Sequence, residues 1–349
     1  MHQQVRSTLI DLRDRPAYRP GMDRRRFLLT SLAGALAAPL RGEAQPANKV
    51  PRIGVLWGGP AEFARPYLEA GRRALGDLGH VEGRDFAVEY AFGERKPGAV
   101  DVLAPGLVQR KVDMIVAAGD PAIYAARRAT STIPIVMVAA GDPVGGGLVA
   151  SLARPGGNVT GMTFLSTELA AKRLEILKEI VPTVSRVAVL WNPDNPGGTR
   201  EFGVIQTAAR IMRLTLQSLE VRTATDIEQA FGSMADKQVR AVLVVTDPVT
   251  AAYSGRPIAD LATKSRLPVM GELREFTNTG SLVSYGPSLL SMVQRVAIFV
   301  DKILKGTRPG DLPVEQPTTF ELVINMKTAK ALGLTIPQSL LLRADELIQ

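Results

Sequence analysis

The chain of 349 residues has no cysteine and only two histidines, His2 and His80. The absence of cysteine excludes disulfides, thiolate metal ligands and cysteine nucleophiles. His80 lies in a polar turn bounded by glycines, so Ser-His catalysis and histidine-rich metal sites have little basis in the body of the chain. We therefore expect no metal site.

The usual signatures of nucleotide and nucleic-acid binding are also missing. The glycine run Gly145-Gly146-Gly147 has neither the G-x-G-x-x-G spacing nor the lysine of a P-loop. No block of Lys and Arg with interleaved aromatic residues follows residue 44, and the residues up to that point carry half of the formal net charge of +8. We therefore expect no cofactor and no nucleic-acid partner.

The apolar run near the N-terminus is too short to span a membrane. It extends from Leu28 to Leu40, only thirteen residues, which is the length of the apolar region of a signal peptide. Arg24-Arg25 precedes it, and Gly42-Glu43-Ala44 after it has small residues at the two positions that a signal peptidase reads. This order predicts a twin-arginine signal peptide within residues 1–44, cleaved after Ala44, with an upstream extension before Met22.

Three predicted strands end in the dipeptide Asp-Pro, at Asp120, Asp142 and Asp247. Apolar runs such as Ile135–Val138 suit strands that are buried on both faces of a parallel sheet. Asp is a good helix cap and Pro suits the first helical position, so we expect a helix to begin at each dipeptide. Because ligands bind at the carboxyl edge of such sheets, the three carboxylates are either caps alone or part of a site.

Two similar cycles of strands and helices follow one another, in a chain long enough for two domains. The first runs from Arg52–Trp57 to Asp120 and the second from Val187–Trp191 to Asp247, and both begin in Val-Leu-Trp and end in Asp-Pro. Alternating strands and helices predict two doubly wound α/β lobes with parallel sheets. Further strands and a helix remain after Asp247, so we expect three crossovers between the lobes and a hinged cleft. Trp57 and Trp191 occupy equivalent strand ends, so they either face each other across this cleft or are core residues under the sheet edge.

Four segments carry a family resemblance: LGHVEGRDFAVEY, GDPVGGGLVASLARPGGNVTGM, LEILKEIVPTVSRVAVLWNPDNPG and VDKILKGTRPGDLPVEQPTTFELVINMKTAKALGL. They resemble the periplasmic substrate-binding proteins of ABC importers, in particular the branch with tryptophan- and tyrosine-binding members. The resemblance covers most of the chain after the signal peptide and implies the type I periplasmic binding protein fold. We expect lobe 1 to comprise residues 50–161 and 284–313, and lobe 2 to comprise residues 162–283 and 314–349.

In proteins of this family the ligand is contacted by loops at the strand ends. Many relatives have Thr-Pro or Ser-Pro where this chain has Asp120-Pro121, so an additional carboxylate is expected here. The residues expected to contact the ligand are Trp57, Gly58, Gly59, Asp120, Asp142, Trp191, Asn192, Asn195, Asp247 and Glu272.

The resemblance implies an extracytoplasmic, periplasmic protein that captures a small polar ligand. The expected ligand is an amino acid or a related amine, and the expected partner is an ABC permease in the inner membrane. The protein is expected to be a monomer and to deliver its ligand to this permease. A periplasmic sensor that presents its ligand to a receptor is an open alternative. A cleft enzyme using paired carboxylates is a further rival, which the scarcity of histidine and cysteine disfavours.

Overall fold

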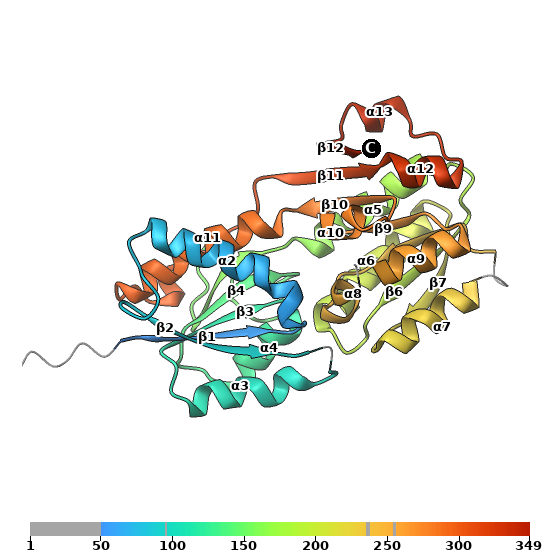
Figure 1. The fold of residues 1–349 in the computed structure, drawn as a ribbon. Coiled ribbons are helices and arrows are strands. Elements are labelled where there is room, and N and C mark those ends of the chain that lie inside the picture. The colour runs from blue at the N-terminus through green and yellow to red at the C-terminus, as the bar shows by residue number, and fades with distance from the viewer. Residues whose placement is uncertain (1–49, 95, 235–237, 254–255) are drawn as a thin grey trace, which may run out of the picture. The chain divides into compact units, whose positions relative to one another are not determined.

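A computed structural model describes residues 50–94, 96–234, 238–253 and 256–349. The signal peptide predicted for residues 1–44 lies outside this described part of the chain. Within the described part, no helix is both long and apolar enough to cross a membrane. Residues 50–349 form two α/β lobes, each built on its own sheet (Figure 1).

The first lobe contains a five-stranded parallel sheet in the order β2-β1-β3-β4-β5. Helices α2 and α11 cover one face of this sheet, and α3 and α4 cover the other (Figure 1). Because side chains alternate along a strand, Ile53 and Val55 pack under α2 and α11, whereas Leu56 packs under α3 and α4. The strands are β1 (Arg52–Trp57), β2 (Ala87–Phe92), β3 (Met114–Ala118), β4 (Ile135–Ala140) and β5 (Val159–Thr163). The helices are α2 (Ala61–Asp77), α3 (Ala99–Gln109), α4 (Asp120–Ala129) and α11 (Leu289–Leu304).

The second lobe contains a seven-stranded sheet in the order β12-β11-β10-β9-β8-β6-β7. Val187 and Val189 pack toward α5 and α6, and Ala188 and Leu190 toward α7 and α9. The strands are β6 (Arg186–Trp191), β7 (Thr215–Glu220), β8 (Ala241–Val244), β9 (Val269–Gly271), β10 (Val283–Pro287), β11 (Phe320–Asn325) and β12 (Glu346–Ile348). The helices are α5 (Ser166–Ile180), α6 (Pro196–Ile211), α7 (Ala224–Met234), α8 (Pro248–Ala252), α9 (Arg256–Ser265), α10 (Arg274–Asn278), α12 (Met326–Leu332) and α13 (Gln338–Leu341).

Three connections join the two sheets, which confirms the expected crossovers. The chain leaves the first lobe between β5 and α5, returns at Ser288 between β10 and α11, and leaves again after the short helix η2 (Pro309–Asp311). The lobe limit predicted at residue 284 falls inside β10, which pairs with β9 and β11 in the second sheet. Strand β11 is antiparallel to β10, with Phe320 paired to Pro287, because the chain re-enters the sheet at the end where β10 leaves it.

The three Asp-Pro dipeptides adopt three different local structures. Asp247 is the expected cap of α8, with its side chain accepting from the N–H of Val249. Asp120 instead is the first residue of α4, whose N-cap is Gly119. The helix expected at Asp142 is wrong, because the Asp142 Oδ1 accepts from the N–H of Gly145 at 2.8 Å and the glycines that follow continue in turns.

Candidate ligand-binding site

A pocket lies at the carboxyl ends of strands from both lobes, with about 670 Å³ of space that no atom fills, part of it open to solvent. Trp57 ends β1 in register with Phe92 of β2 and Ala118 of β3, which aligns these strand ends at one edge of the first sheet. The loops after β8 and β9 close the pocket from the second lobe. The lining residues are Trp57, Gly59, Phe63, Ala118, Gly119, Asp120, Ala139, Phe164, Ser166, Asn195, Thr246, Asp247, Pro248, Ala251, Glu272, Leu273 and Leu289.

The structure brings most of the residues predicted from the sequence to this pocket or next to it. Gly58 lies against the second lobe, where a Cβ atom would approach Pro248 Cγ to 2.7 Å, so only glycine fits without a shift. Asn192 stands behind the pocket and donates from Nδ2 to the Asp247 Oδ1 at 3.1 Å. The predicted residues that line the pocket are Trp57, Gly59, Asp120, Asn195, Asp247 and Glu272.

Trp191 does not face Trp57, so of the two alternatives the one in which the tryptophans face each other across the cleft is wrong. The Trp191 ring stacks on Phe202 of α6 with 4.3 Å between centroids, and its Nε1 donates to Ser218 Oγ at 2.8 Å. The Trp191 side chain lies on the face of β6 that packs against α5 and α6, as do the side chains of Val187 and Val189. The indole is therefore part of the core of the second lobe.

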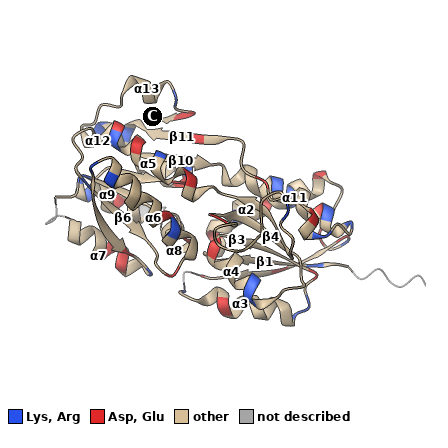
Figure 2. Ribbon diagram, turned by 180° about the vertical axis from the view of Figure 1, so that it is seen from behind, with Lys and Arg blue, Asp and Glu red and all other residues tan. Residues whose placement is uncertain are grey.

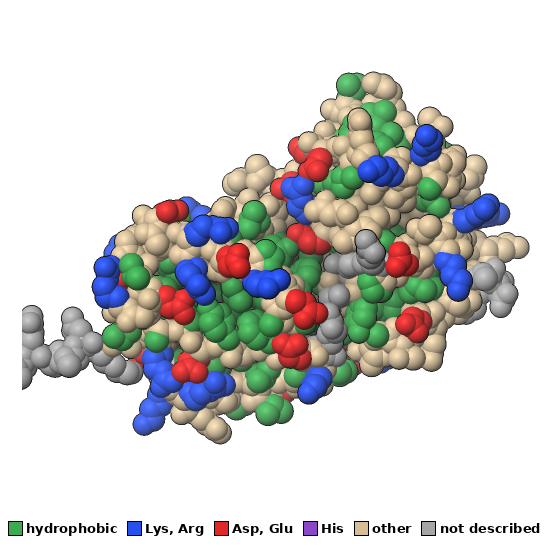
Figure 3. All heavy atoms as spheres, in the orientation of Figure 1, with side chains coloured by type: hydrophobic (Ala, Val, Ile, Leu, Met, Phe, Trp, Pro, Cys, Tyr) green, Lys and Arg blue, Asp and Glu red, His purple; other side chains and the backbone are tan. Residues whose placement is uncertain are grey.

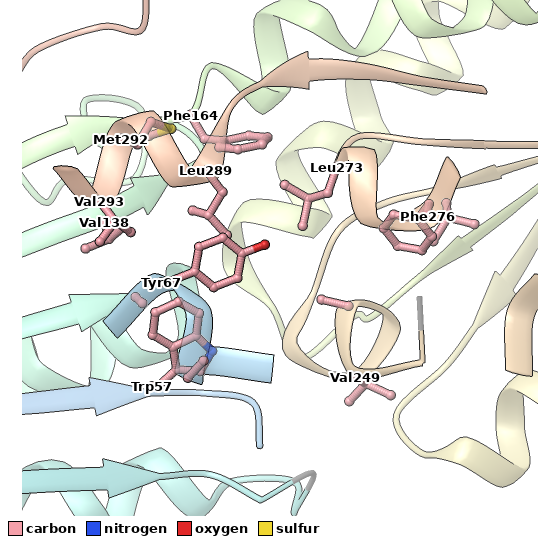
Figure 4. Packing of buried hydrophobic residues seen from close by; sticks show 14 of the residues in the cluster. Trp57, Tyr67, Val138, Phe164, Val249, Leu273, Phe276, Leu289, Met292 and Val293 are labelled. Carbon is pink, nitrogen blue, oxygen red and sulfur yellow. The ribbon is translucent and has the colours of Figure 1, made fainter. Parts of the chain in front are cut away.

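Aromatic and aliphatic side chains form the apolar wall of the pocket. The Trp57 ring stacks on Tyr67 with 5.8 Å between centroids, and Figure 4 shows Leu289 on the other side of the Tyr67 ring, with Phe164 beyond it. Phe63 packs at an angle to Trp57 from the first turn of α2. Sequence reasoning missed Phe63 and Phe164, although Phe164 follows directly after β5 and so belongs to the same sheet edge.

Asp120 is a buried carboxylate with few hydrogen-bond donors. Its side chain is 8% exposed, and its two oxygens share the single N–H of Gly141 at 3.2 and 3.3 Å. The pKa of Asp120 is raised to about 6, because the effect of burial exceeds the opposite effects of the Gly141 hydrogen bond and the charge of Arg200. The carboxylate lies against α6 of the second lobe, since a Cβ atom at Gly197 would be 1.7 Å from Asp120 Oδ2.

Asp247 is held by amide donors. Asn192 and Asn195 each donate from Nδ2 at 3.1 Å, and the N–H of Val249 donates at 2.9 Å. Burial nevertheless raises the pKa of this carboxyl above its usual range. These bonds fix the orientation of Asp247 at the pocket.

Glu272 belongs to a buried network behind the pocket. The Arg173 guanidinium is completely buried and lies 2.7 Å from Glu201 Oε1 and 3.3 Å from Glu272 Oε1. Burial, followed by the charge of Glu272, raises the pKa of Glu201 well above its usual range, although the charge of Arg173 lowers it. Glu272 also accepts from Ser166 Oγ at 3.3 Å and from the N–H of Thr246 at 3.4 Å.

This fold is similar to that of solved substrate-binding proteins of transporters. Residues 69–348 match the profile of the family described as ABC transporter substrate binding protein. The chain belongs to this family. The family consists of substrate-binding proteins rather than enzymes, and the type I periplasmic binding protein fold implied by the sequence is confirmed.

The relatives of this substrate-binding protein include one curated protein and several solved structures. The tyrosine-binding protein of Clostridioides difficile strain R20291 is 28% identical over 264 residues, which are 75% of each chain. A conserved domain protein of Vibrio cholerae has a TM-score of 0.80 at 28% identity, covering 86% of this chain and 100% of that one. An ABC domain from Streptococcus pneumoniae in complex with L-Trp has a TM-score of 0.77 at 25% identity, covering 85% and 99%.

The substrate-binding protein also has polar contacts that join its lobes beside the pocket. Arg200 of α6 donates from Nη2 to the Tyr124 hydroxyl at 2.8 Å, and its Nε lies 3.6 Å from Asp142 Oδ2. The Tyr67 hydroxyl donates to Glu275 of α10. Asp142 therefore contributes to the contact between lobes, and it does not line the pocket itself.

Proposed function

We propose that this substrate-binding protein holds an amino acid or a related amine in the pocket between its lobes. The observation that carries this proposal is the group of buried carboxylates Asp120, Asp247 and Glu272 beside the rings of Trp57 and Phe164. Carboxylates form strong charge-assisted hydrogen bonds with ammonium groups, and aromatic faces attract cations. The ligands named for two relatives, tyrosine and L-Trp, are aromatic compounds with an amino group.

The predicted site residues take direct and indirect parts in this proposal. Gly58 allows close approach of the lobes, Asn192 orients Asp247, and Asp142 supports the lobe contact through Arg200. Trp191 stabilises the second lobe only. The residues proposed to contact the ligand are Trp57, Gly59, Asp120, Asn195, Asp247 and Glu272.

We also propose that the protein is exported by the twin-arginine route, loses its signal peptide near Ala44 and works in the periplasm as a monomer without enzymatic activity. An ABC permease in the inner membrane would receive the ligand. Figure 2 shows Lys and Arg interspersed with Asp and Glu along the ribbon, and Figure 3 shows the same mixture on one face of the molecule. This distribution suits a protein that does not bind nucleic acid. N-terminal sequencing of the periplasmic form tests this route, and an uncleaved Arg24-Arg25 would contradict it.

Calorimetric titration of the purified protein with L-tyrosine, L-tryptophan, tyramine and tryptamine tests the proposed ligand class. At least one of the four should bind, and Asp247→Asn should weaken that binding by about tenfold or more, as expected for loss of a buried charged hydrogen-bond partner. Asp101→Asn is the matched control, because Asp101 lies exposed on α3 of the same protein. Binding of none of the four would refute the proposed ligand class.

A further inference from the structure

A second pocket lies inside the first lobe, next to the pocket described above, which is called the ligand pocket here. It has about 680 Å³ of space that no atom fills, part of it open to solvent. Its walls come from α2 and α11 on one side and from β1, β2, β3 and β4 on the other. We infer that this space, the lobe-1 cavity, is a binding site for a small neutral apolar molecule, and that its occupant acts on the ligand pocket through Trp57.

The packing of the helices on the sheet is incomplete at the lobe-1 cavity. Val116 lies in β3, between β1 and β4, yet its side chain is only partly buried. Interiors of proteins are normally close-packed, with few voids larger than a water molecule. On the helix side the cavity is lined by Gly71 of α2 and Ala297 of α11, which have little or no side chain. The small residues therefore leave space over the middle of the sheet.

The walls of the lobe-1 cavity favour an apolar occupant. Ile53, Val138 and Val293 are among the aliphatic side chains that form most of its lining. The charged side chains in the lining, Arg72 and Glu82, pair with each other, with 3.0 Å between Nε and Oε2, and Arg72 is exposed to solvent. A polar group placed against the aliphatic walls would lose its hydration without gaining a hydrogen bond, which is costly. An apolar molecule has no such cost, and apolar cavities in proteins bind small apolar molecules.

The depth of the lobe-1 cavity favours a small molecule over the surface of another protein. Ile53, Phe86, Val138 and Ala297 line it, and each is no more than 3% exposed. Atoms this deep between a sheet and its covering helices can be reached only by a molecule small enough to enter. The space also falls within the range of roughly 300–1,000 Å³ that is typical of small-molecule pockets.

Trp57 and Tyr67 form the partition between the lobe-1 cavity and the ligand pocket. Trp57 lines both spaces, and its ring stacks on Tyr67. In Figure 4 the two rings lie between Val138, which lines the cavity, and Leu273, which lines the ligand pocket. The Tyr67 hydroxyl also donates to Glu275 of the second lobe. Resting on the proposed function, we expect an occupant of the cavity to hold these rings in place and so to raise ligand affinity.

Toluene and phenol test the chemistry of the lobe-1 cavity, because they have nearly the same shape and phenol carries a hydroxyl group. Methyl NMR spectra of the purified protein follow each titration. We expect toluene to shift the signals of Val116 and Val138 saturably, and to bind about fivefold or more tightly than phenol, whose hydroxyl would be buried without a partner. Equal affinities, or no saturable shift with toluene, would overturn the inference.

Two variants fill the lobe-1 cavity from opposite walls. Ala297→Leu should abolish the toluene shifts and Val116→Leu should weaken toluene binding severalfold, and neither residue lines the ligand pocket. Leu290→Ala is the matched control on α11, because Leu290 is exposed and lines neither space, so it should bind toluene as the wild type does. Added atoms that fill empty space should also raise the midpoint of thermal unfolding. A lower midpoint in both variants would show overpacking of a filled core, and unchanged toluene binding in both would place toluene elsewhere. Either result would overturn the inference.

The coupling to the ligand pocket is measured by calorimetry with whichever of L-tyrosine, L-tryptophan, tyramine and tryptamine binds. Saturating toluene should tighten that binding about fivefold or more. Weaker binding would show competition for the ligand pocket, and an unchanged affinity would show that the two spaces are independent, so either result would overturn the coupling. Binding of none of the four would overturn the proposed function and the coupling with it, whereas the toluene titration decides the lobe-1 cavity by itself.

Discussion

At the scale of single residues, Asp120 combines the proposed role in binding with a cost in stability. The carboxylate is buried, and burial raises its pKa to about 6 from an ordinary value of 3.8. The folded protein therefore binds this proton more tightly than the unfolded chain does. Below pH 3.8 both states are protonated, and as the pH rises to about 6 the folded state loses stability through this group.

Asp120→Asn should therefore stabilise the protein at neutral pH. The pKa difference corresponds to about 3 kcal/mol of unfolding free energy at pH 7.5, and the gain should vanish toward pH 4, where the wild-type carboxyl is already neutral. Urea unfolding of the wild type and the variant at both pH values measures it. An equal difference at pH 4 and pH 7.5 would show that ionisation of Asp120 is not its cause.

Residue-level reasoning from sequence succeeded where a strand end fixed the position, and failed where the face of the sheet on which the side chain lies decided. Trp57 ends β1 and Asp120 comes shortly after β3, and the pocket lies beside them. Trp191 occupies the equivalent position in the second cycle, yet its ring packs on Phe202. Which face of a sheet lies beside a cleft depends on how two lobes meet, and the hydrophobic pattern of one strand does not contain that information.

At the scale of elements, the apolar runs at Arg52–Trp57, Ile135–Val138 and Val187–Trp191 each lie within a strand, because burial on both sheet faces requires such runs. The error at Asp142 has a local cause, since its side chain closes a turn before three glycines that disfavour a helix. Helix α6 carries a feature that no pattern shows. Its Gly197 is required by Asp120 of the other lobe, because a Cβ atom there would clash with the carboxylate.

Gly197→Ala tests whether the amino end of α6 must remain open to Asp120. We expect ligand affinity to fall about tenfold or more, because the new Cβ would lie 1.7 Å from Asp120 Oδ2 and must push the lobes or the carboxylate apart. Gly203→Ala on the same helix is the control, since a Cβ there meets nothing within 4 Å. That control should keep its affinity and gain roughly 0.5–1 kcal/mol of stability. Equal affinities of the two variants would contradict the requirement.

At the scale of the whole molecule, Arg200 connects the chemistry of the pocket with the contact between lobes. It extends from α6 of the second lobe to Tyr124 and Asp142 of the first, and its charge lowers the pKa of Asp120. A binding protein that holds its ligand between two lobes gains affinity from contacts that favour the arrangement in which both lobes touch the ligand. Arg200 should therefore influence affinity without touching the ligand.

Arg200→Met retains much of the apolar stem of the side chain and removes the guanidinium. We expect ligand affinity to fall about three- to tenfold, because the Tyr124 and Asp142 contacts disappear while the pocket lining stays the same. Arg210→Met is the matched control on the same helix, where Arg210 is exposed and bonds only with Thr207 among the hydrogen bonds described for its side chain. Calorimetry gives the affinities.

Because Arg200 also lowers the pKa of Asp120, the loss of affinity in Arg200→Met should be larger near pH 6 than at pH 8, where Asp120 is ionised in both proteins. A loss that is independent of pH would restrict Arg200 to the lobe contact, and no loss at either pH would exclude it from both roles.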